Sequence, residues 1–157
     1  MSVFNPKDTY NNNFKIAIVV ANFNSLISEQ LRFGAMDAFY HSGGNENNIE
    51  FHYVPGALEI AGTVKQLIDS FKYDAILTLG AVIKGGTPHF DFVAGESADK
   101  IALLSVQSNI PILFGVLTTD TLEQALERAG TKALNKGWEL MEATLLTIHT
   151  YSKISIK

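Results

Sequence analysis

Apolar residues gather in four short runs that predict buried strands. The run from Phe14 to Val20, FKIAIVV, is short and rich in β-branched residues, as buried parallel strands are. Residues 74–83 and 111–117 have the same character, and Pro111 stands at the first position of its run, where a missing N–H matters least. Residues 49–54 alternate enough between apolar and polar positions to predict a fourth strand.

In the segments between these runs, apolar residues recur at the spacing of a helix. Over residues 25 to about 42 apolar side chains recur at helical spacing, and two glycines follow, as they do where helices end. The inward positions are Leu31, Ala35, Met36 and Phe39. Further helices are predicted over residues 57–71, 89–108, 120–129 and 138–151. Asp120, with Glu123 three residues on, predicts a capping box at the start of one of them.

Regular alternation of strands and helices predicts right-handed βαβ crossovers and a parallel sheet. The expected fold is an α/β three-layer sandwich, flavodoxin-like in form, with a four-stranded parallel sheet and helices on both faces. A chain of 157 residues without linker or repeat is expected to be a single domain, with a polar, Asn-rich arm at residues 1–13. In such sheets ligands bind outside the carboxyl ends of the strands.

Composition excludes several classes of function. The formal net charge is -4 and no run of Lys or Arg occurs, which argues against a nucleic-acid surface. The absence of cysteine excludes disulfides, thiolate nucleophiles and Cys-ligated zinc, and the four histidines lack metal-motif spacing. Since neither a signal peptide nor a membrane-spanning segment is predicted, the expected location is the cytoplasm.

Residues that can carry chemistry fall at the carboxyl ends of all four predicted strands. The segments at these ends are Asn22 to Asn24, Pro55 to Glu59, Lys84 to His89 and Thr118 to Asp120. They bring an aromatic ring, a carboxylate, a glycine-rich turn and a histidine to one edge of the sheet. We therefore expect a ligand site at this edge.

The segment GAVIKGGTPHFDFV, residues 80–93, is the most informative of the chain. Its two consecutive glycines allow unusual backbone torsions and a close approach to a ligand. Thr87 is predicted as a helix N-cap and Pro88 as the first helical residue. His89 then lies beside backbone N–H groups without partners, which combines an anion site with a titratable side chain.

Each candidate residue also has a structural interpretation that these patterns leave open. Phe23 is either a packing aromatic or a stacking face for a planar heterocycle. Glu59 either complements the dipole of its helix or binds a substrate. His89 is either a hydrogen-bonded structural histidine or a functional one, and Arg128 is either a solvated partner of a helix C-terminus or a functional cation.

Four separated motifs resemble those of the 6,7-dimethyl-8-ribityllumazine synthase family, and the resemblance covers about residues 14–146. The motifs are ANFN at residues 21–24, VPGALEI at 54–60, the segment 80–93, and FGVLTTDTLEQALERAGTKALNKG at 114–137. The resemblance implies a condensation of 5-amino-6-(D-ribitylamino)uracil with 3,4-dihydroxy-2-butanone 4-phosphate. The product is 6,7-dimethyl-8-ribityllumazine, an intermediate of riboflavin biosynthesis, and phosphate and water are released. No cofactor or metal is implied.

The resemblance also implies a set of residues for the pyrimidine substrate. Phe23 corresponds to the aromatic ring that stacks on the pyrimidine, and Phe114 to a residue that enters the site from a neighbouring subunit. The segments that bind the ribityl chain and the pyrimidine edge correspond to Ala57, Leu58 and Glu59, and to Ala81, Val82 and Ile83.

For the phosphate substrate, the resemblance implies a turn, a catalytic residue and two cations. Gly86 and Thr87 correspond to the phosphate-binding turn, and His89 to the catalytic histidine. Arg128 corresponds to a residue that reaches the phosphate from a neighbouring subunit, and Lys136 to a further basic residue nearby.

The family implies a homo-oligomer with shared sites, either a ring of five subunits or an icosahedral shell of twelve such rings. The short AGTKALNKG turn carries no insertion that blocks a shell. Riboflavin synthase is the candidate protein partner. The sequence departs from common family residues at Lys84, Gly86 and Leu134, which bears on the phosphate site and on the last helix pair.

Two alternatives belong to other classes of protein. One is a flavin- or lumazine-binding carrier that uses the same glycine turn and aromatic ring without chemistry. The other is a shell-forming protein whose site has decayed, against which the presence of Phe23, His89 and Arg128 argues.

Overall fold

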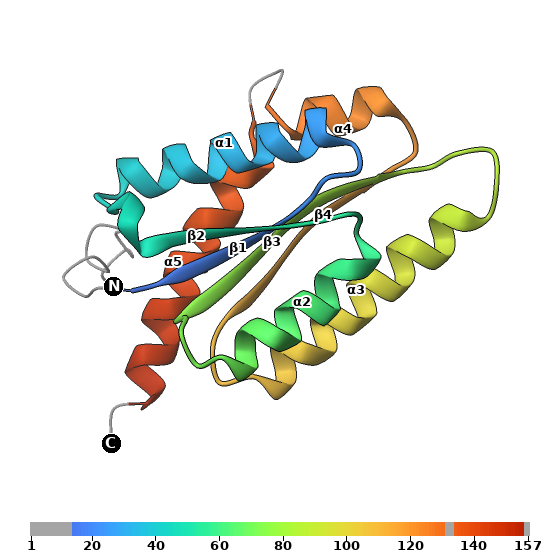
Figure 1. The fold of residues 1–157 in the computed structure, drawn as a ribbon. Helices are drawn as coiled ribbons and strands as arrows, with labels where there is room; N and C mark the ends of the chain where they lie inside the picture. The colour runs from blue at the N-terminus through green and yellow to red at the C-terminus, as the bar shows by residue number, and fades with distance from the viewer. Residues whose placement is uncertain (1–13, 131–133, 156–157) are drawn as a thin grey trace.

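The structure, a computed structural model, describes residues 14–130 and 134–155 (Figure 1). The predicted N-terminal arm and part of the AGTKALNKG turn lie outside these residues. The strands are β1 (Ile16–Ala21), β2 (Ile49–Val54), β3 (Ala75–Ile83) and β4 (Ile112–Thr119). The helices are α1 (Ser25–His41), the 3-10 helix η2 (Glu46–Asn48), α2 (Leu58–Asp69), α3 (His89–Gln107), α4 (Leu122–Arg128) and α5 (Lys136–Ser155).

The four strands form one parallel sheet in the order β2-β1-β3-β4. The chain places β2 on one side of β1 and β3 on the other, so the strand order switches direction between β1 and β3. The carboxyl ends of these two strands therefore flank the point at which flavodoxin-like sheets bind ligands. The predicted fold class, a flavodoxin-like α/β sandwich with a four-stranded parallel sheet, is confirmed.

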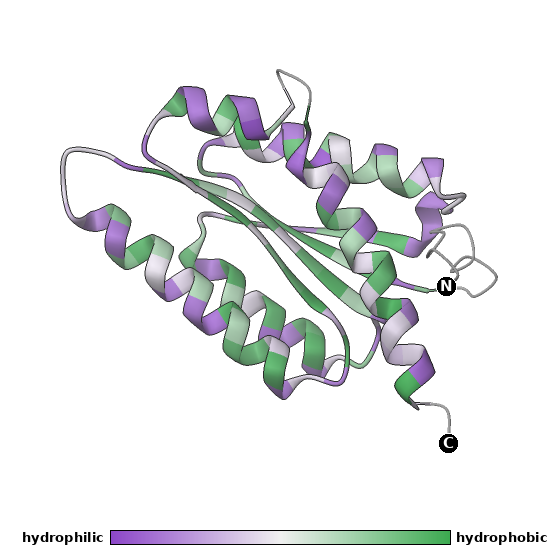
Figure 2. Ribbon diagram, turned by 180° about the vertical axis from the view of Figure 1, so that it is seen from behind, coloured by the Kyte–Doolittle hydropathy of each residue, from purple (hydrophilic) through white to green (hydrophobic). Residues whose placement is uncertain are grey.

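Helices cover both faces of the sheet and bury two apolar cores. Helices α1, α4 and α5 lie on one face, and α2 and α3 lie on the other (Figure 1). The six side chains of β1 are all fully buried, because this central strand contributes alternately to the two cores. Figure 2 shows mostly hydrophobic strands between helices of mixed hydropathy, as expected when helices turn their apolar side to a sheet.

Helix starts differ from the prediction at two places. Asp120 does not cap α4: the residue at the cap is Thr121, whose Oγ1 accepts a hydrogen bond from the Gln124 amide at 3.2 Å. The Asp120 amide in turn donates to Gln124 Oε1 at 2.9 Å. The bonds resemble a capping box one residue later than predicted, except that Gln124 Oε1 accepts from the Asp120 amide and not from that of the cap residue Thr121.

At the start of α3 the predicted cap by Thr87 is also wrong. Pro88 occupies the cap position, and no side chain caps this helix end. Pro88 has helical torsions (φ -68°, ψ 0°) but lies at the cap, so α3 begins at His89, one residue later than predicted. The first turn of α3 is therefore left without a side-chain acceptor for its amides.

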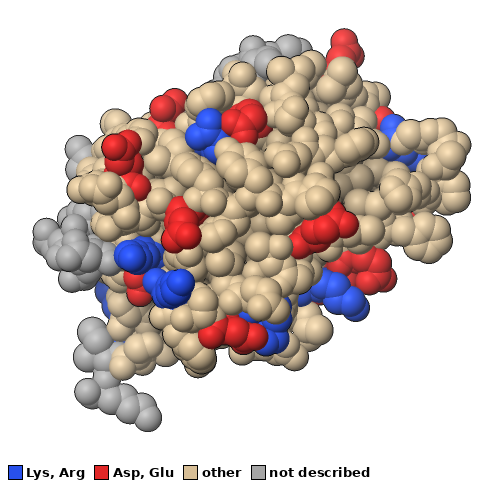
Figure 3. Space-filling model, in the orientation of Figure 1, with Lys and Arg blue, Asp and Glu red and all other residues tan. Residues whose placement is uncertain are grey.

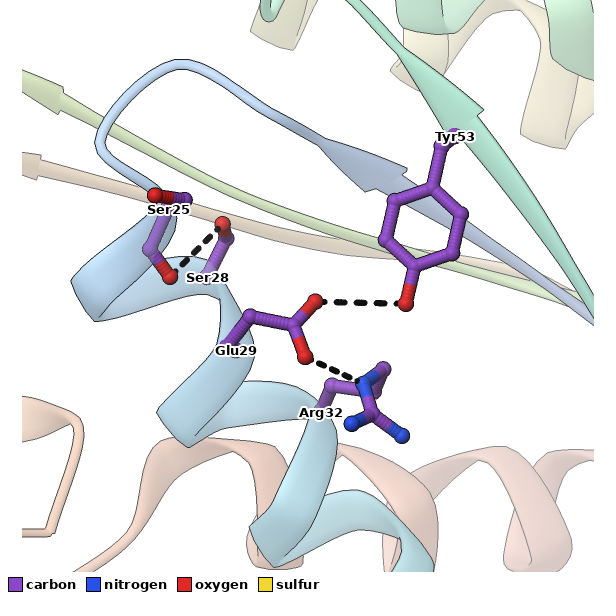
Figure 4. A network of polar contacts seen from close by, with 5 residues as sticks. All are labelled: Ser25, Ser28, Glu29, Arg32 and Tyr53. Carbon is purple, nitrogen blue, oxygen red and sulfur yellow. Dashed lines mark hydrogen bonds and ion pairs between the residues drawn. The ribbon is translucent and has the colours of Figure 1, made fainter.

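A polar network fastens the edge strand β2 to α1 (Figure 4). Tyr53 on β2 donates to Glu29 Oε1 on α1 at 3.2 Å, and Arg32 Nε donates to the other carboxylate oxygen at 2.8 Å. Burial and the neighbouring Glu29 raise the pKa of Tyr53. The network holds the carboxyl end of β2 beside the first turns of α1.

Charged side chains of both signs are mixed on one face of the described residues. On the face drawn in Figure 3, acidic and basic side chains are scattered over a largely uncharged surface. Within the part of the chain that the structure describes, no helix is both long and apolar enough to cross a membrane.

Candidate active site

A cleft of about 470 Å³ opens at the carboxyl ends of β1, β2 and β3. Nine of the residues predicted for the site line it, and they come from four separate segments of the chain. They are Phe23, Ala57, Leu58, Glu59, Ala81, Val82, Ile83, Thr87 and His89. The strand-end rule and the resemblance therefore lead to the same place in the fold.

Phe23 stands at the rim of the cleft with 72% of its surface exposed. Its amide donates to the Pro55 carbonyl at 3.0 Å, and the Asn22 amide donates to the Val54 carbonyl at 2.8 Å. These bonds continue the pairing of β1 with β2 past the ends of both strands and fix the backbone that carries the ring. At this exposure the ring does not pack in the core of its own chain, and its face is open at the rim of the cleft.

Asn24 follows in the left-handed conformation, with φ 59° and ψ 46°. Asparagine tolerates this region better than most residues do. Although Asn24 occupies the N-cap position of α1, its side chain does not cap that helix. Instead Nδ2 donates to the Ala81 carbonyl at 2.9 Å, which joins the end of β1 to β3 inside the cleft. The sequence analysis included Asn24 only in a strand-end segment and in the ANFN motif and gave it no role.

The N-terminus of α2 forms another wall. The Ala57 carbonyl accepts a hydrogen bond from buried Ser97 of α3 at 3.1 Å, which fixes the start of one helix against the other. Glu59 lies in the first turn with its carboxylate folded back over Gly56, where a Cβ atom would come 3.2 Å from Oε2. Pro55 and Gly56 also line the cleft, and they were predicted only as part of a strand-end segment.

His89 is the first residue of α3, and its side chain is exposed. Among the described residues no hydrogen bond or ion pair to its imidazole is present, so nothing supports the interpretation as a hydrogen-bonded structural histidine. Phe90, the next residue, and Val93, one turn further along α3, add apolar surface to the cleft. A spacing argument could have found Val93, four residues after His89 on the same helix.

The glycine turn before α3 differs from its predicted role. Neither Gly85 nor Gly86 has a positive φ, and a Cβ atom on either would meet no atom within 4 Å. Unusual torsions are therefore not what these glycines provide. They leave open space beside the backbone, which suits a ligand that approaches it closely. Gly85 lines the cleft, and Gly86 does not.

Three other predicted residues lie away from the cleft of their own chain. Phe114 is 37% exposed on the edge strand β4, five residues before its carboxyl end at Thr119. At about 3.3 Å per residue, that is about 17 Å from the edge at which the cleft opens. Arg128 ends α4 and Lys136 begins α5, and neither lines the cleft.

Both cations keep contacts within their own helices. Arg128 Nη1 donates to the Gln124 carbonyl at 3.2 Å, and within the described ranges no carboxylate pairs with it. Lys136 Nζ pairs with Glu139 at 2.6 Å. Arg128 thus agrees with its alternative interpretation, as a solvated residue at a helix C-terminus, as long as a single chain is considered.

A second group of titratable residues lies at the opposite end of the sheet. Tyr73 donates to Glu50 at 2.7 Å, and His52 Nε2 lies 3.2 Å from the Tyr73 hydroxyl. Burial and the hydrogen bond to Glu50 raise the pKa of Tyr73 to about 12, and the same bond lowers the pKa of Glu50. Every member of this group has a partner, which is typical of a structural cluster.

Comparison with known proteins gives a consistent result. The sequence matches the model of the 6,7-dimethyl-8-ribityllumazine synthase family over residues 13–152. The enzyme of that name from Nautilia profundicola is 52% identical over 142 residues, which cover 90% of this chain and 92% of that protein. The corresponding protein of Campylobacter jejuni is 50% identical over 145 residues (92% and 94%). That of Desulfatibacillum aliphaticivorans is 53% identical over 126 residues (80% and 81%).

Proposed function

Because the chain belongs to the 6,7-dimethyl-8-ribityllumazine synthase family, we propose that it carries out the family reaction in the cleft beside His89. The enzyme is a transferase of riboflavin biosynthesis. It condenses 5-amino-6-(D-ribitylamino)uracil with 3,4-dihydroxy-2-butanone 4-phosphate to 6,7-dimethyl-8-ribityllumazine and releases phosphate and water. The observation that carries the location is the convergence of nine predicted residues on one cleft.

The pyrimidine is proposed to lie between Phe23 and the end of β3. An exposed aromatic face at the rim can stack on a planar heterocycle. The backbone of Ala81 to Ile83 offers amides and carbonyls to the edge of the same ring. The ribityl hydroxyls then fall beside Ala57 to Glu59, where the Glu59 carboxylate is a strong acceptor.

The phosphate is proposed to sit at the start of α3, on Gly86 and Thr87. No side chain caps this helix, so its first amides and its dipole are available to an anion. The open space beside the two glycines lets the phosphate oxygens approach the backbone. The Thr87 hydroxyl can add a further donor from the wall of the cleft.

His89 is proposed as the group that moves protons. The primary 5-amino group attacks the ketone, and the carbinolamine loses water to give an imine. A carbon-bound proton and phosphate are then eliminated, and the ribitylamino nitrogen closes the ring with loss of water. These steps need protons taken from nitrogen or carbon and given to leaving oxygens, and His89 lines the cleft that holds both proposed subsites. Orientation of the two substrates supplies a further large share of the rate.

We propose that Phe114, Arg128 and Lys136 complete the site of a neighbouring copy. Helix α3 buries only Ser97 and Ile101 of its 19 residues. Large apolar side chains remain exposed on α3 and β4: Phe92 at 69%, Leu103 at 50%, Val106 at 85% and Phe114 at 37%. Exposed apolar surface of this kind marks an interface between chains.

A ring of five subunits, alone or as part of an icosahedral shell, is the proposed assembly. A head-to-tail contact between copies that closes into a ring lets each subunit lend residues to the site of the next. Riboflavin synthase is the proposed protein partner, and the cytoplasm the proposed location. The whole chain, residues 1–157, is proposed to act as one catalytic domain.

The test is to mix the purified protein with both substrates and to follow the fluorescence of the lumazine product. We expect acceleration over the uncatalysed mixture, and saturation by each substrate separately. No acceleration would contradict the enzyme. A yellow, flavin-loaded protein without turnover would instead support the alternative, a flavin- or lumazine-binding carrier.

A further inference from the structure

The side chain of Asn135 joins three helices through four hydrogen bonds. Nδ2 donates to the Gln30 carbonyl of α1 at 3.0 Å and to the Ala129 carbonyl at the end of α4 at 2.9 Å. Oδ1 accepts from the amides of Gly137 at 2.7 Å and Trp138 at 3.3 Å, in the first turn of α5. An asparagine amide has two donor hydrogens and two acceptor sites, so this side chain is fully used.

Glycines make the room that this arrangement needs. A Cβ atom on Gly34 of α1 would lie 2.1 Å from Asn135 Oδ1, and one on Gly130 would lie 2.9 Å from Nδ2. A Cβ atom on Gly137 would lie 1.9 Å from the Leu31 carbonyl oxygen. Gly130 also has φ +104°, a conformation that other residues rarely adopt. Three glycines are thus fitted around Asn135.

The Asn135 side chain makes more hydrogen bonds than the cap of α5 requires. Capping α5 needs only Oδ1, which accepts from the second and third residues of the helix, as N-cap residues do. The two Nδ2 bonds are additional, and both go to carbonyls outside α5. Ala129 and Asn135 also form an antiparallel bridge, so the end of α4 and the start of α5 are held side by side.

We propose that Asn135 is a positioning residue for Arg128. Arg128 directly precedes Ala129, whose carbonyl Asn135 holds, and its own guanidinium has only a carbonyl of its helix as partner among the described residues. The orientation of α4 relative to α1 and α5 therefore sets where the guanidinium points. This inference rests on the proposed function, in which Arg128 binds the phosphate at a neighbouring site.

The substitution Asn135→Asp separates positioning from capping. It keeps the oxygen that caps α5 and replaces the donor group with an oxygen that faces the Ala129 and Gln30 carbonyls. Steady-state kinetics of the oligomer should show KM for 3,4-dihydroxy-2-butanone 4-phosphate raised about tenfold, while KM for the pyrimidine stays within about twofold. Asn135→Ser keeps a capping oxygen and places no second oxygen against the Ala129 and Gln30 carbonyls. It should also raise KM for the ketone phosphate.

Two comparisons make the test specific. Asn45→Asp is the matched control, since Asn45 caps η2 by accepting from the Asn47 amide at 3.0 Å, far from the cleft, and it should change neither KM. In an Arg128→Ala background, Asn135→Asp should add less than about twofold, because a residue that acts through another has no separate effect once that partner is gone.

The outcomes divide cleanly. If Arg128→Ala raises KM for the ketone phosphate and neither Asn135 variant does, the positioning role is overturned and the proposed function stands. A fall in active protein with both KM values unchanged would show that Asn135 is merely structural, and would also overturn the proposal. If Arg128→Ala itself leaves that KM unchanged, Arg128 is removed from the proposed phosphate site, and the role of Asn135 fails with it.

Discussion

The histidines at the two ends of the sheet have opposite environments, one paired and one unpaired among the described residues. At the amino end His52 lies 3.2 Å from the Tyr73 hydroxyl and 3.6 Å from Glu50, in a cluster whose members all have partners. At the carboxyl end His89 stands exposed beside a helix start that no side chain caps. Polar groups that a fold leaves unpaired in a cleft are available to a ligand, whereas paired ones contribute to stability.

The largest effect is expected from His89→Ala. Loss of a general acid–base group costs about 10²–10⁴ in rate, and we expect the low end because the other cleft residues still orient both substrates. Turnover measured with saturating substrates should fall about 100-fold, with the unfolding temperature unchanged. A loss far beyond this range would show that His89 carries more of the rate than proposed. A large fall in stability would show that His89 is structural, as His52 is.

Arg128→Ala should act on one substrate only. We expect KM for the ketone phosphate to rise about tenfold or more, because charge-assisted hydrogen bonds to phosphate are lost, with little change in KM for the pyrimidine. Initial rates over a range of each substrate separate the two values. Unchanged saturation by the phosphate substrate would remove Arg128 from the site.

His52→Ala is the matched counterpart of His89→Ala. It should leave turnover within about twofold and reduce the free energy of unfolding by about 1 kcal/mol, as expected for a lost hydrogen bond at a half-buried site. Urea unfolding and the fluorescence assay on the same preparation measure both quantities. A marked loss of turnover with stability intact would show that His52, at the amino end, takes part in catalysis, and would contradict the comparison.

One expected effect is confined to alkaline pH. An unfolded tyrosine ionises near pH 10.0 and Tyr73 near 12, so between these values the folded protein holds a proton that the unfolded chain has lost. The stability that Tyr73 contributes is complete below pH 10.0 and is lost as pH rises toward 12. Thermal unfolding of Tyr73→Phe should therefore depend less on pH in this window than that of the parent, and equal slopes would argue against the shift.

Much of this fold follows from local pattern. The alternation over residues 49–54 gives β2 at its observed bounds, and the helical spacing of Leu31, Ala35 and Phe39 gives the buried side of α1. Helix starts are less predictable, since Asp120 and Thr121 are both good caps and the backbone selects one of them. At the start of α3, Pro88 rather than Thr87 occupies the cap position.

The asparagines show where local pattern gives no information. Asn24 donates to a carbonyl 57 positions away and Asn135 to one 105 positions away, so no window of sequence contains either partner. Helical spacing could not indicate Phe114 and Arg128 either, since neither reaches the cleft of its own chain. Their proposed roles depend on the family resemblance and on the exposed surface of α3 and β4.

The most direct measurement is complementation between two impaired variants, His89→Ala and Arg128→Ala, co-expressed with different tags and purified through both. If each site takes its histidine from one subunit and its arginine from the next, about a quarter of the sites in a randomly mixed ring contain both residues. We predict that the mixed oligomer recovers up to about that fraction of parental activity at low ketone phosphate concentration, well above either variant alone. Activity no higher than the average of the two variants would contradict a site shared between copies.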